Sequence, residues 1–213
     1  MPETDCLAAL RLVTKAPHAR LDAGLPLGRD EATLEDYRHH TLALSAWLRA
    51  LYPHLSTLEP LAPGFRFADP ARLDALHRDT QDAHDAHDAH DAHSPPAPDG
   101  AGISECTCAL VEEALAPFGP AGHAAVCWGL AYVVEGSQLG GQLLFRRLAS
   151  RLAPHPLRYL QGAGSATGDR WKRFTLLLNA SVKSDFCIRA AGAGARAGFE
   201  SLQREFQDNG VFA

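Results

Sequence analysis

Gly129, Gly136, Gly140 and Gly141 lie inside one apolar segment at about residues 120–152, and its pattern of apolar residues predicts a single long helix. Steps of seven and four residues place Gly129, Gly136 and Gly140 on one face of that helix, with Gly141 next in the chain. Each interior glycine costs about 1 kcal/mol of helix stability relative to alanine, so the helix must gain something from lacking side chains there. Either the Gly136-x-x-x-Gly140 spacing lets another helix approach closely, or a flat ligand lies against the bare backbone.

The rest of the sequence also predicts helices. Leu and Ala dominate its apolar residues, Val and Ile are few, and no hairpin turn separates alternating runs. With 213 residues, 46% of them apolar, the chain is long enough for one domain with a substantial core. We therefore predict an all-α, single-domain helical bundle over residues 1–213.

Prolines and capping residues predict the helix boundaries. Pro17 should bend or break a first helix at about 4–23, and Pro53 should end the second, because proline removes a backbone donor and crowds the preceding turn. The other expected boundaries are a capping box at Thr33 and Asp36, starts at Asp69-Pro70 and after Ser104, a short helix after Pro156, and helices near 169–183 and 185–207.

Charge and composition exclude several functional classes. Lys and Arg number 20 against 25 Asp and Glu, a net charge of −5, which argues against a nucleic-acid groove or a basic membrane-binding surface. No apolar run approaches the ~20 residues of a membrane span, and the segment from Met1 to Asp5 lacks the basic start of a secretory signal. We expect a soluble, cytoplasmic protein that binds neither nucleic acid nor membrane.

The five cysteines are odd in number and scattered, which favours reduced thiols over a disulfide scaffold. Cys106 and Cys108 are close enough to share a metal, but no second pair of ligands follows at a spacing typical of zinc sites. We expect all five to be buried or inert thiols.

Four copies of Asp-Ala-His, from Asp82 to His93, are followed by a proline-rich run at 94–98. This low-complexity segment predicts a solvated, mobile and dispensable insertion at about 82–103. A run of histidines is also able to bind divalent metals, so a metal-binding or storage module centred on the repeat is an alternative.

His18 is a candidate ligand for haem iron. Neutral imidazole is the commonest proximal ligand of haem, and Arg11, seven residues earlier on the same helical face, would suit a propionate carboxylate. A stripe of Arg11, Lys15, His18 and Asp22 is equally what a solvent-exposed helix face contains. Periodicity alone leaves both interpretations open.

Two segments resemble motifs of one enzyme family. The run from Leu10 to Asp22, LRLVTKAPHARLD, resembles the proximal-helix motif of haem oxygenases. The run from Tyr132 to Gln142, YVVEGSQLGGQ, looks like their glycine-rich distal-helix motif. The two lie about 120 residues apart in the family's order, and the likeness is strongest to the bacterial biliverdin-forming branch that includes enzymes supplying chromophore to bacteriophytochromes.

The resemblance implies a haem-oxygenase-like fold with haem sandwiched between the first helix and the glycine-rich helix. It implies cleavage of haem to biliverdin, ferrous iron and CO, with O2 and with electrons from an external reductase or ferredoxin. His18 takes the place of the proximal iron ligand, and Gly136, Ser137 and Gly140 take the catalytic distal positions. The other haem-binding positions implied are Arg11, Tyr132, Gly141 and Arg173.

The chain departs from the family pattern at some of these positions. Ser137 stands where animal enzymes carry a distal acidic residue, and Pro17 directly precedes the expected ligand. Lys172, Arg173 and Lys183 are all candidates for the family's C-terminal basic contacts, whereas Trp128 and Trp171 are expected to be packing residues. A non-catalytic haem carrier or sensor on the same scaffold is the alternative function.

Overall fold

The computed structural model describes residues 5–88 and 102–212, and within these ranges the chain is helical, with no strand. The α-helices are α1 (Cys6–Gly24), α2 (Leu34–Ser56), α3 (Pro70–Asp88), α4 (Glu105–Leu115), α5 (Gly119–Leu148), α6 (Arg158–Gln161), α7 (Thr167–Ser181) and α8 (Asp185–Asp208). Short 3-10 turns occur at Pro26–Gly28, Glu59–Leu61 and Gly164–Ala166. The predicted all-α fold class is confirmed.

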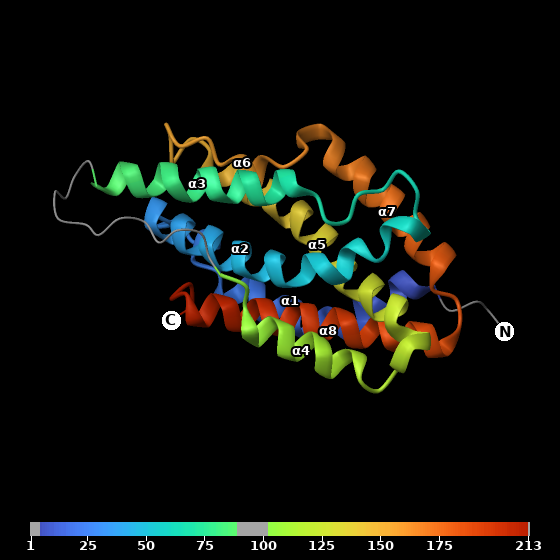
Figure 1. The fold of residues 1–213 in the computed structure, drawn as a ribbon. Helices are drawn as coiled ribbons and strands as arrows, with labels where there is room; N and C mark the ends of the chain where they lie inside the picture. The colour runs from blue at the N-terminus through green and yellow to red at the C-terminus, as the bar shows by residue number, and fades with distance from the viewer. Residues whose placement is uncertain (1–4, 89–101, 213) are drawn as a thin grey trace.

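The helices pack around one apolar core that α5 crosses obliquely. Figure 1 shows α2 and α3 along one side, α8 with α4 and α1 along the other, and α5 running between them toward α6 and α7. Trp47, Trp128 and Phe174 are among the largest side chains that are fully buried. In the described parts of the chain, none of the helices combines the length and apolar character needed to cross a bilayer.

Two helix starts follow the predicted capping residues. The Thr33 hydroxyl accepts from the Asp36 amide at 3.1 Å, and the Asp36 carboxylate accepts from the Thr33 amide at 2.8 Å, which completes the capping box of α2. Ser104 accepts from the Thr107 amide at 2.9 Å and caps α4.

A helix break at Pro17 and a helix end at Pro53 are both absent from the structure. Pro17 does not break α1, and Pro53 does not end α2, which continues to Ser56. Packing on both sides of each proline offsets the lost hydrogen bond: Pro17 is buried, with its carbonyl accepting from Gln203 Nε2 at 3.2 Å, and Leu55 beyond Pro53 is fully buried.

A close crossing of α5 and α8 explains one of the helix glycines. A Cβ on Gly129 would lie 1.9 Å from the Ala191 carbonyl oxygen, and a Cβ on Gly194 would lie 2.0 Å from the Val126 oxygen. Backbone therefore touches backbone at this point, which only glycine permits. Close helix packing is correct for Gly129, but the helix contact considered for Gly136 and Gly140 is wrong, because a Cβ on Gly140 would meet nothing within 4 Å.

The Asp-Ala-His repeat begins inside α3 rather than in an insertion. Its first two copies continue the helix to Asp88, Ala83 is buried, and Asp82 pairs with Arg158 at 2.6 Å. The first two copies of the repeat therefore belong to a core-packed helix, and a dispensable insertion within about 82–103 stays a prediction for the rest of that range. The later copies and the proline-rich run lie outside the described residues.

Candidate functional site

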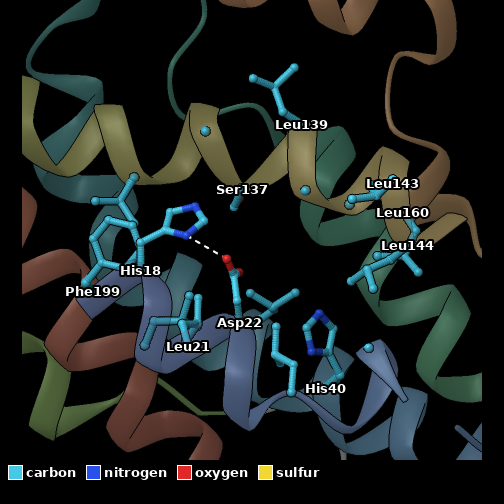
Figure 2. Close-up of a pocket in the computed structure, with 18 of the residues that line it drawn as sticks. His18, Leu21, Asp22, His40, Ser137, Leu139, Leu143, Leu144, Leu160 and Phe199 are labelled. Atoms are coloured by element: carbon cyan, nitrogen blue, oxygen red, sulfur yellow. Dashed lines mark ion pairs between the residues drawn. The ribbon is translucent and has the colours of Figure 1, made fainter. Parts of the chain in front are cut away.

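A cavity of about 550 Å³ lies between α1 and α5, with α2, α6, α7 and α8 completing its wall. Its lining is mostly apolar, and its size is typical of a site for a small organic ligand. Figure 2 shows His18 and Asp22 on α1 facing Ser137 on α5 across this space. The sequence-predicted residues that line it are His18, Tyr132, Gly136, Ser137, Gly140 and Gly141.

His18 is held by an acidic neighbour one helical turn later. Its Nδ1 lies 2.8 Å from Asp22 Oδ2, which leaves Nε2 as the nitrogen with a lone pair to offer when Nδ1 carries the proton. The ring packs against Phe199 of α8, with ring centroids 5.6 Å apart, and 58% of the side chain is exposed. A fixed and accessible imidazole is the arrangement that ligation of a metal requires.

The glycines of the predicted distal motif leave one wall of the cavity without side chains. A Cβ on Gly136 would meet only the far ring atoms of Trp171, at 3.8 Å, and one on Gly141 would lie 3.7 Å from Leu160. Glycine is thus not required here by contacts within the protein, in contrast to Gly129. The space in front of this backbone fits a flat ligand.

Near this wall, several buried polar atoms have no hydrogen-bond partner. Tyr159 Oη, Gln138 Nε2, Thr167 Oγ1 and Arg72 Nη1 make no hydrogen bond to any described residue. Burial raises the pKa of the Tyr159 phenol, while Arg72, Ser137 and Gln138 act in the opposite direction, so these groups lie near one another. Buried polar atoms without protein partners are where ordered water is expected.

Tyr132 and Trp171 share one edge of the cavity. Their ring centroids are 5.8 Å apart, and the Tyr132 hydroxyl lies 3.5 Å from Thr14 Oγ1 on α1. Trp171 was expected to be a packing residue. Its ring does pack against Phe174, at a tilt and with centroids 5.5 Å apart, but it also lines the cavity.

Comparisons with known proteins identify the family to which this chain belongs. A family model described as "Heme oxygenase" matches residues 4–208. The chain belongs to the haem oxygenase family. A relative named "Heme oxygenase", from Xanthomonas campestris pv. campestris (strain 8004), is 38% identical over 91 residues, 42% of this chain and 53% of the relative. The matched part therefore spans about half the length of that relative.

In this haem oxygenase family member, Arg11 and Arg173 were predicted to contact haem, but neither residue lines the cavity. Arg11 is exposed outside the cavity, because seven residues of helix place it about 10 Å along the axis from His18. Arg173 follows Trp171 by two residues, which turns it away from the cavity, and its guanidinium lies 5.8 Å from the Phe65 ring. Lys172 and Lys183 are exposed and do not line the cavity either.

Sequence reasoning missed two cationic or ionisable residues that do line it. Arg147 lies seven residues after Gly140, hence on the same helical face, and donates to the Gly28 carbonyl at 2.9 Å. That spacing was a usable signal. His40 had no such signal: it is buried, stacks on Phe206 with ring centroids 4.9 Å apart, and has no partner for Nδ1 among the described residues. Burial lowers its pKa to about 4, so this imidazole is neutral at pH 7.

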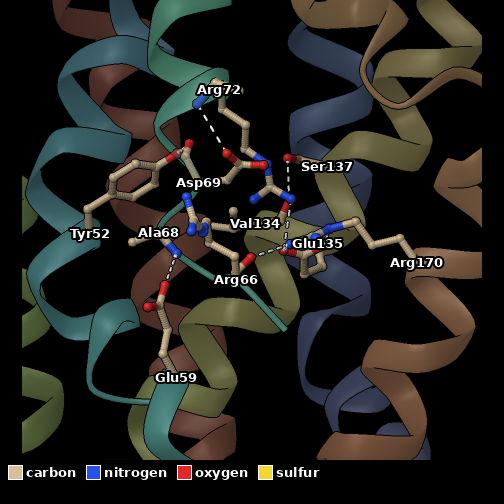
Figure 3. Close-up of polar contacts among 11 residues, drawn as sticks. Tyr52, Glu59, Arg66, Ala68, Asp69, Arg72, Val134, Glu135, Ser137 and Arg170 are labelled. Atoms are coloured by element: carbon tan, nitrogen blue, oxygen red, sulfur yellow. Dashed lines mark hydrogen bonds and ion pairs between the residues drawn. The ribbon is translucent and has the colours of Figure 1, made fainter. Parts of the chain in front are cut away.

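A buried ion pair network fixes α5 next to the glycine motif (Figure 3). Glu135 accepts from Arg72 of α3 at 2.8 Å and from Arg170 of α7 through both carboxylate oxygens, at 2.7 and 2.8 Å. Glu135 and Arg72 are almost fully buried. Glu135 lies within the quoted family motif, but its partners are 63 and 35 residues away, so no local pattern could reveal them.

Proposed function

We propose that this protein is a haem-degrading monooxygenase that cleaves haem to biliverdin, ferrous iron and CO, using O2 and electrons from an external donor. One observation carries the proposal: His18 and the side-chain-free backbone of Gly136, Gly140 and Gly141 line the same cavity. Membership of the haem oxygenase family supports it.

The residues of the cavity fit haem. Leu21, Leu44, Leu144 and Phe206 are among the side chains that supply an apolar lining for the macrocycle, and the glycines leave room for a flat ring. When bound, haem supplies the iron at which O2 is activated and is itself the molecule that is cleaved. The protein supplies orientation, exclusion of bulk water and placement of protons.

In this proposal, His18 would hold the iron of bound haem through Nε2. The Asp22 carboxylate holds Nδ1–H and thereby fixes the tautomer and the orientation of the ring. A neutral imidazole donates less electron density to the iron than a thiolate does, which disfavours the oxygen chemistry of thiolate-ligated enzymes.

The distal side acts through backbone and water rather than through a charged side chain. The Ser137 hydroxyl donates to the Val134 carbonyl at 2.8 Å, so its oxygen remains able to accept a hydrogen bond from water in the cavity. Ordered water between Ser137, Tyr159 and Gln138 would satisfy the unpaired buried atoms and deliver protons to the reacting face. The Tyr159 phenol remains protonated and able to donate, because burial raises its pKa.

Arg147 replaces Arg11 and Arg173 as the proposed propionate contact. It lies at the cavity wall with 49% of its side chain exposed, as expected for a cation that meets an anionic edge near solvent. Tyr132 is a second polar group at the wall and a further candidate for a propionate.

We further propose that residues 1–213 form one functional unit that works in the cytoplasm, where its free thiols stay reduced. The electron donor would be a ferredoxin or a reductase. The likeness of the 132–142 motif to the bacteriophytochrome-associated branch supports a bacteriophytochrome as acceptor of the biliverdin.

Aerobic turnover of hemin tests the function directly. Purified protein with one equivalent of hemin, a ferredoxin–reductase system and NADPH should lose its haem absorption and form biliverdin. CO should be detected as carbonmonoxymyoglobin formed on added ferrous myoglobin, and iron should be trapped by a ferrous chelator. Intact porphyrin and no released iron after reduction in air would instead establish a carrier or sensor.

A further inference from the structure

Two histidines and a cysteine form a cluster far from the haem cavity. His54 of α2, His123 and Cys127 of α5 each bring one ligand atom to within 4.8 Å of the other two. His123 and Cys127 are four residues apart, so they share a face of α5, and the core packing of α2 on α5 brings His54 to them. Cys127 is fully buried, while both histidines are half-buried.

The spacing is close to that of a metal centre. Around a tetrahedral ion with bonds of about 2.0–2.3 Å, nitrogen and sulfur ligands lie about 3.3–3.6 Å apart. The ligand atoms therefore need shifts of about 1 Å to meet one ion. Three protein ligands leave a fourth position that water can take.

A carboxylate also lies near the cluster. Glu112 of α4 acts electrostatically on the His54 imidazole, which places a negative charge beside the three side chains. Thr57 Oγ1 lies 3.8 Å from Cys127 Sγ and donates its proton to the His54 carbonyl at 2.6 Å, which ties the end of α2 to this side of the cluster.

We propose that His54, His123 and Cys127 bind a borderline-soft divalent transition metal of the Zn²⁺ class. Two imidazoles and a thiolate are ligands that such ions prefer over Mg²⁺ or Ca²⁺. The site ties α2 to α5 and lies about 13 Å along α5 from Gly136, so it is separate from the proposed haem site. The sequence analysis considered metal sites at Cys106 and Cys108 and at the Asp-Ala-His repeat, and it missed this cluster because no local pattern pairs α2 with α5.

Cobalt titration of the reduced, haem-free, full-length protein tests this site. Tetrahedral Co²⁺ with a cysteine ligand gives a thiolate-to-metal charge-transfer absorption in the near ultraviolet together with visible d–d bands. We expect these bands to saturate at one equivalent and to disappear when Zn²⁺ is added in excess. The Asp-Ala-His repeat contains no cysteine, so Co²⁺ bound there cannot produce the charge-transfer band.

Variants assign the ligands. Cys127→Ser should abolish the charge-transfer band, and His54→Ala or His123→Ala should weaken Co²⁺ binding by at least about tenfold. Matched controls at other thiols, Cys108→Ser and Cys187→Ser, should leave it unchanged. The half-buried histidines tolerate truncation, so a folding defect of Cys127→Ser would leave the test intact.

The titration is repeated with the four repeat histidines changed to alanine, to remove competing sites. Loss of the charge-transfer band in that background, its persistence in Cys127→Ser, or its absence from the parent protein would each overturn the proposal. Haem binding and turnover do not enter this test, so its result is independent of the proposed enzyme activity.

Discussion

At the scale of single residues, the cavity holds two imidazoles in opposite environments. His18 is exposed and paired with Asp22, whereas His40 is buried and has no partner for Nδ1. Both line the same space, so either is near enough to bound haem to be considered as a ligand. Position relative to the glycine wall favours His18, because α1 faces α5 across the cavity (Figure 2).

Matched variants separate the two histidines. His18→Ala should lose the histidine-ligated ferric absorption spectrum and bind hemin at least about tenfold more weakly, because the iron loses its protein ligand. His40→Ala should keep that spectrum. Titration of each variant with hemin, followed by absorption spectroscopy, is the measurement. A normal spectrum in His18→Ala with a lost spectrum in His40→Ala would reverse the assignment.

A substitution at Gly140 should weaken hemin binding without lowering the stability of the protein. Gly140→Ala adds a methyl group that meets no protein atom within 4 Å, so the free energy of unfolding should stay level or rise by up to about 1 kcal/mol. The same methyl group enters the space proposed for haem and should weaken hemin binding about tenfold. Denaturant unfolding and hemin titration measure the two effects. Unchanged hemin affinity would contradict a haem face at Gly140.

At the scale of helices, Gly129 is the matched opposite of Gly140. Its added Cβ would lie 1.9 Å from the Ala191 oxygen, so α5 and α8 would have to separate. We expect Gly129→Ala to lower the free energy of unfolding by about 3 kcal/mol or more, despite the better helix propensity of alanine. A stability equal to that of the parent protein would show that this crossing relaxes freely.

The helices were largely predictable from local signals, and their contacts were not. Apolar periodicity and caps at Thr33 and Ser104 located the helices, because these signals act over one or two turns. The helix break expected at Pro17 and the helix end expected at Pro53 do not occur, because core packing stabilises these helices by more than one missing hydrogen bond costs. No local sequence pattern reports that packing. In the same way, His18 and the glycine motif were found by resemblance, whereas Arg147 and His40 depend on how helices meet. Arg11 was expected at the cavity because it shares a helix face with His18. Two residues on one face can still lie far apart along the helix axis, as these two do.

At the scale of the whole molecule, His40 should make stability depend on pH. Its pKa is about 4 in the folded protein, against an ordinary value of 6.5, so between these values the unfolded chain binds more protons. Stability therefore falls as the pH drops from about 6.5 to about 4. For this histidine alone, the loss between pH 7.5 and pH 5 amounts to about 2 kcal/mol.

Denaturant unfolding of haem-free protein at pH 7.5 and pH 5 measures this dependence. Other groups also titrate in this range, so the comparison is with His40→Gln, which cannot be protonated. The variant should lose about 2 kcal/mol less than the parent on acidification. Equal losses in both proteins would mean that His40 is protonated in the folded state at pH 5.

The ion pairs of Glu135 have a consequence for the rotational setting of α5. Successive residues of an α-helix are turned by about 100°, so Glu135 reaches Arg72 and Arg170 only at one rotation of the helix about its axis. That rotation is the one that turns Gly136 and Gly140 toward His18. An apolar contact would hold α5 equally firmly but would tolerate a twist of the helix, whereas a buried carboxylate clasped from two sides does not. Glu135 therefore fixes the rotation of α5 about its axis, and it keeps the glycine face of the helix directed at the cavity.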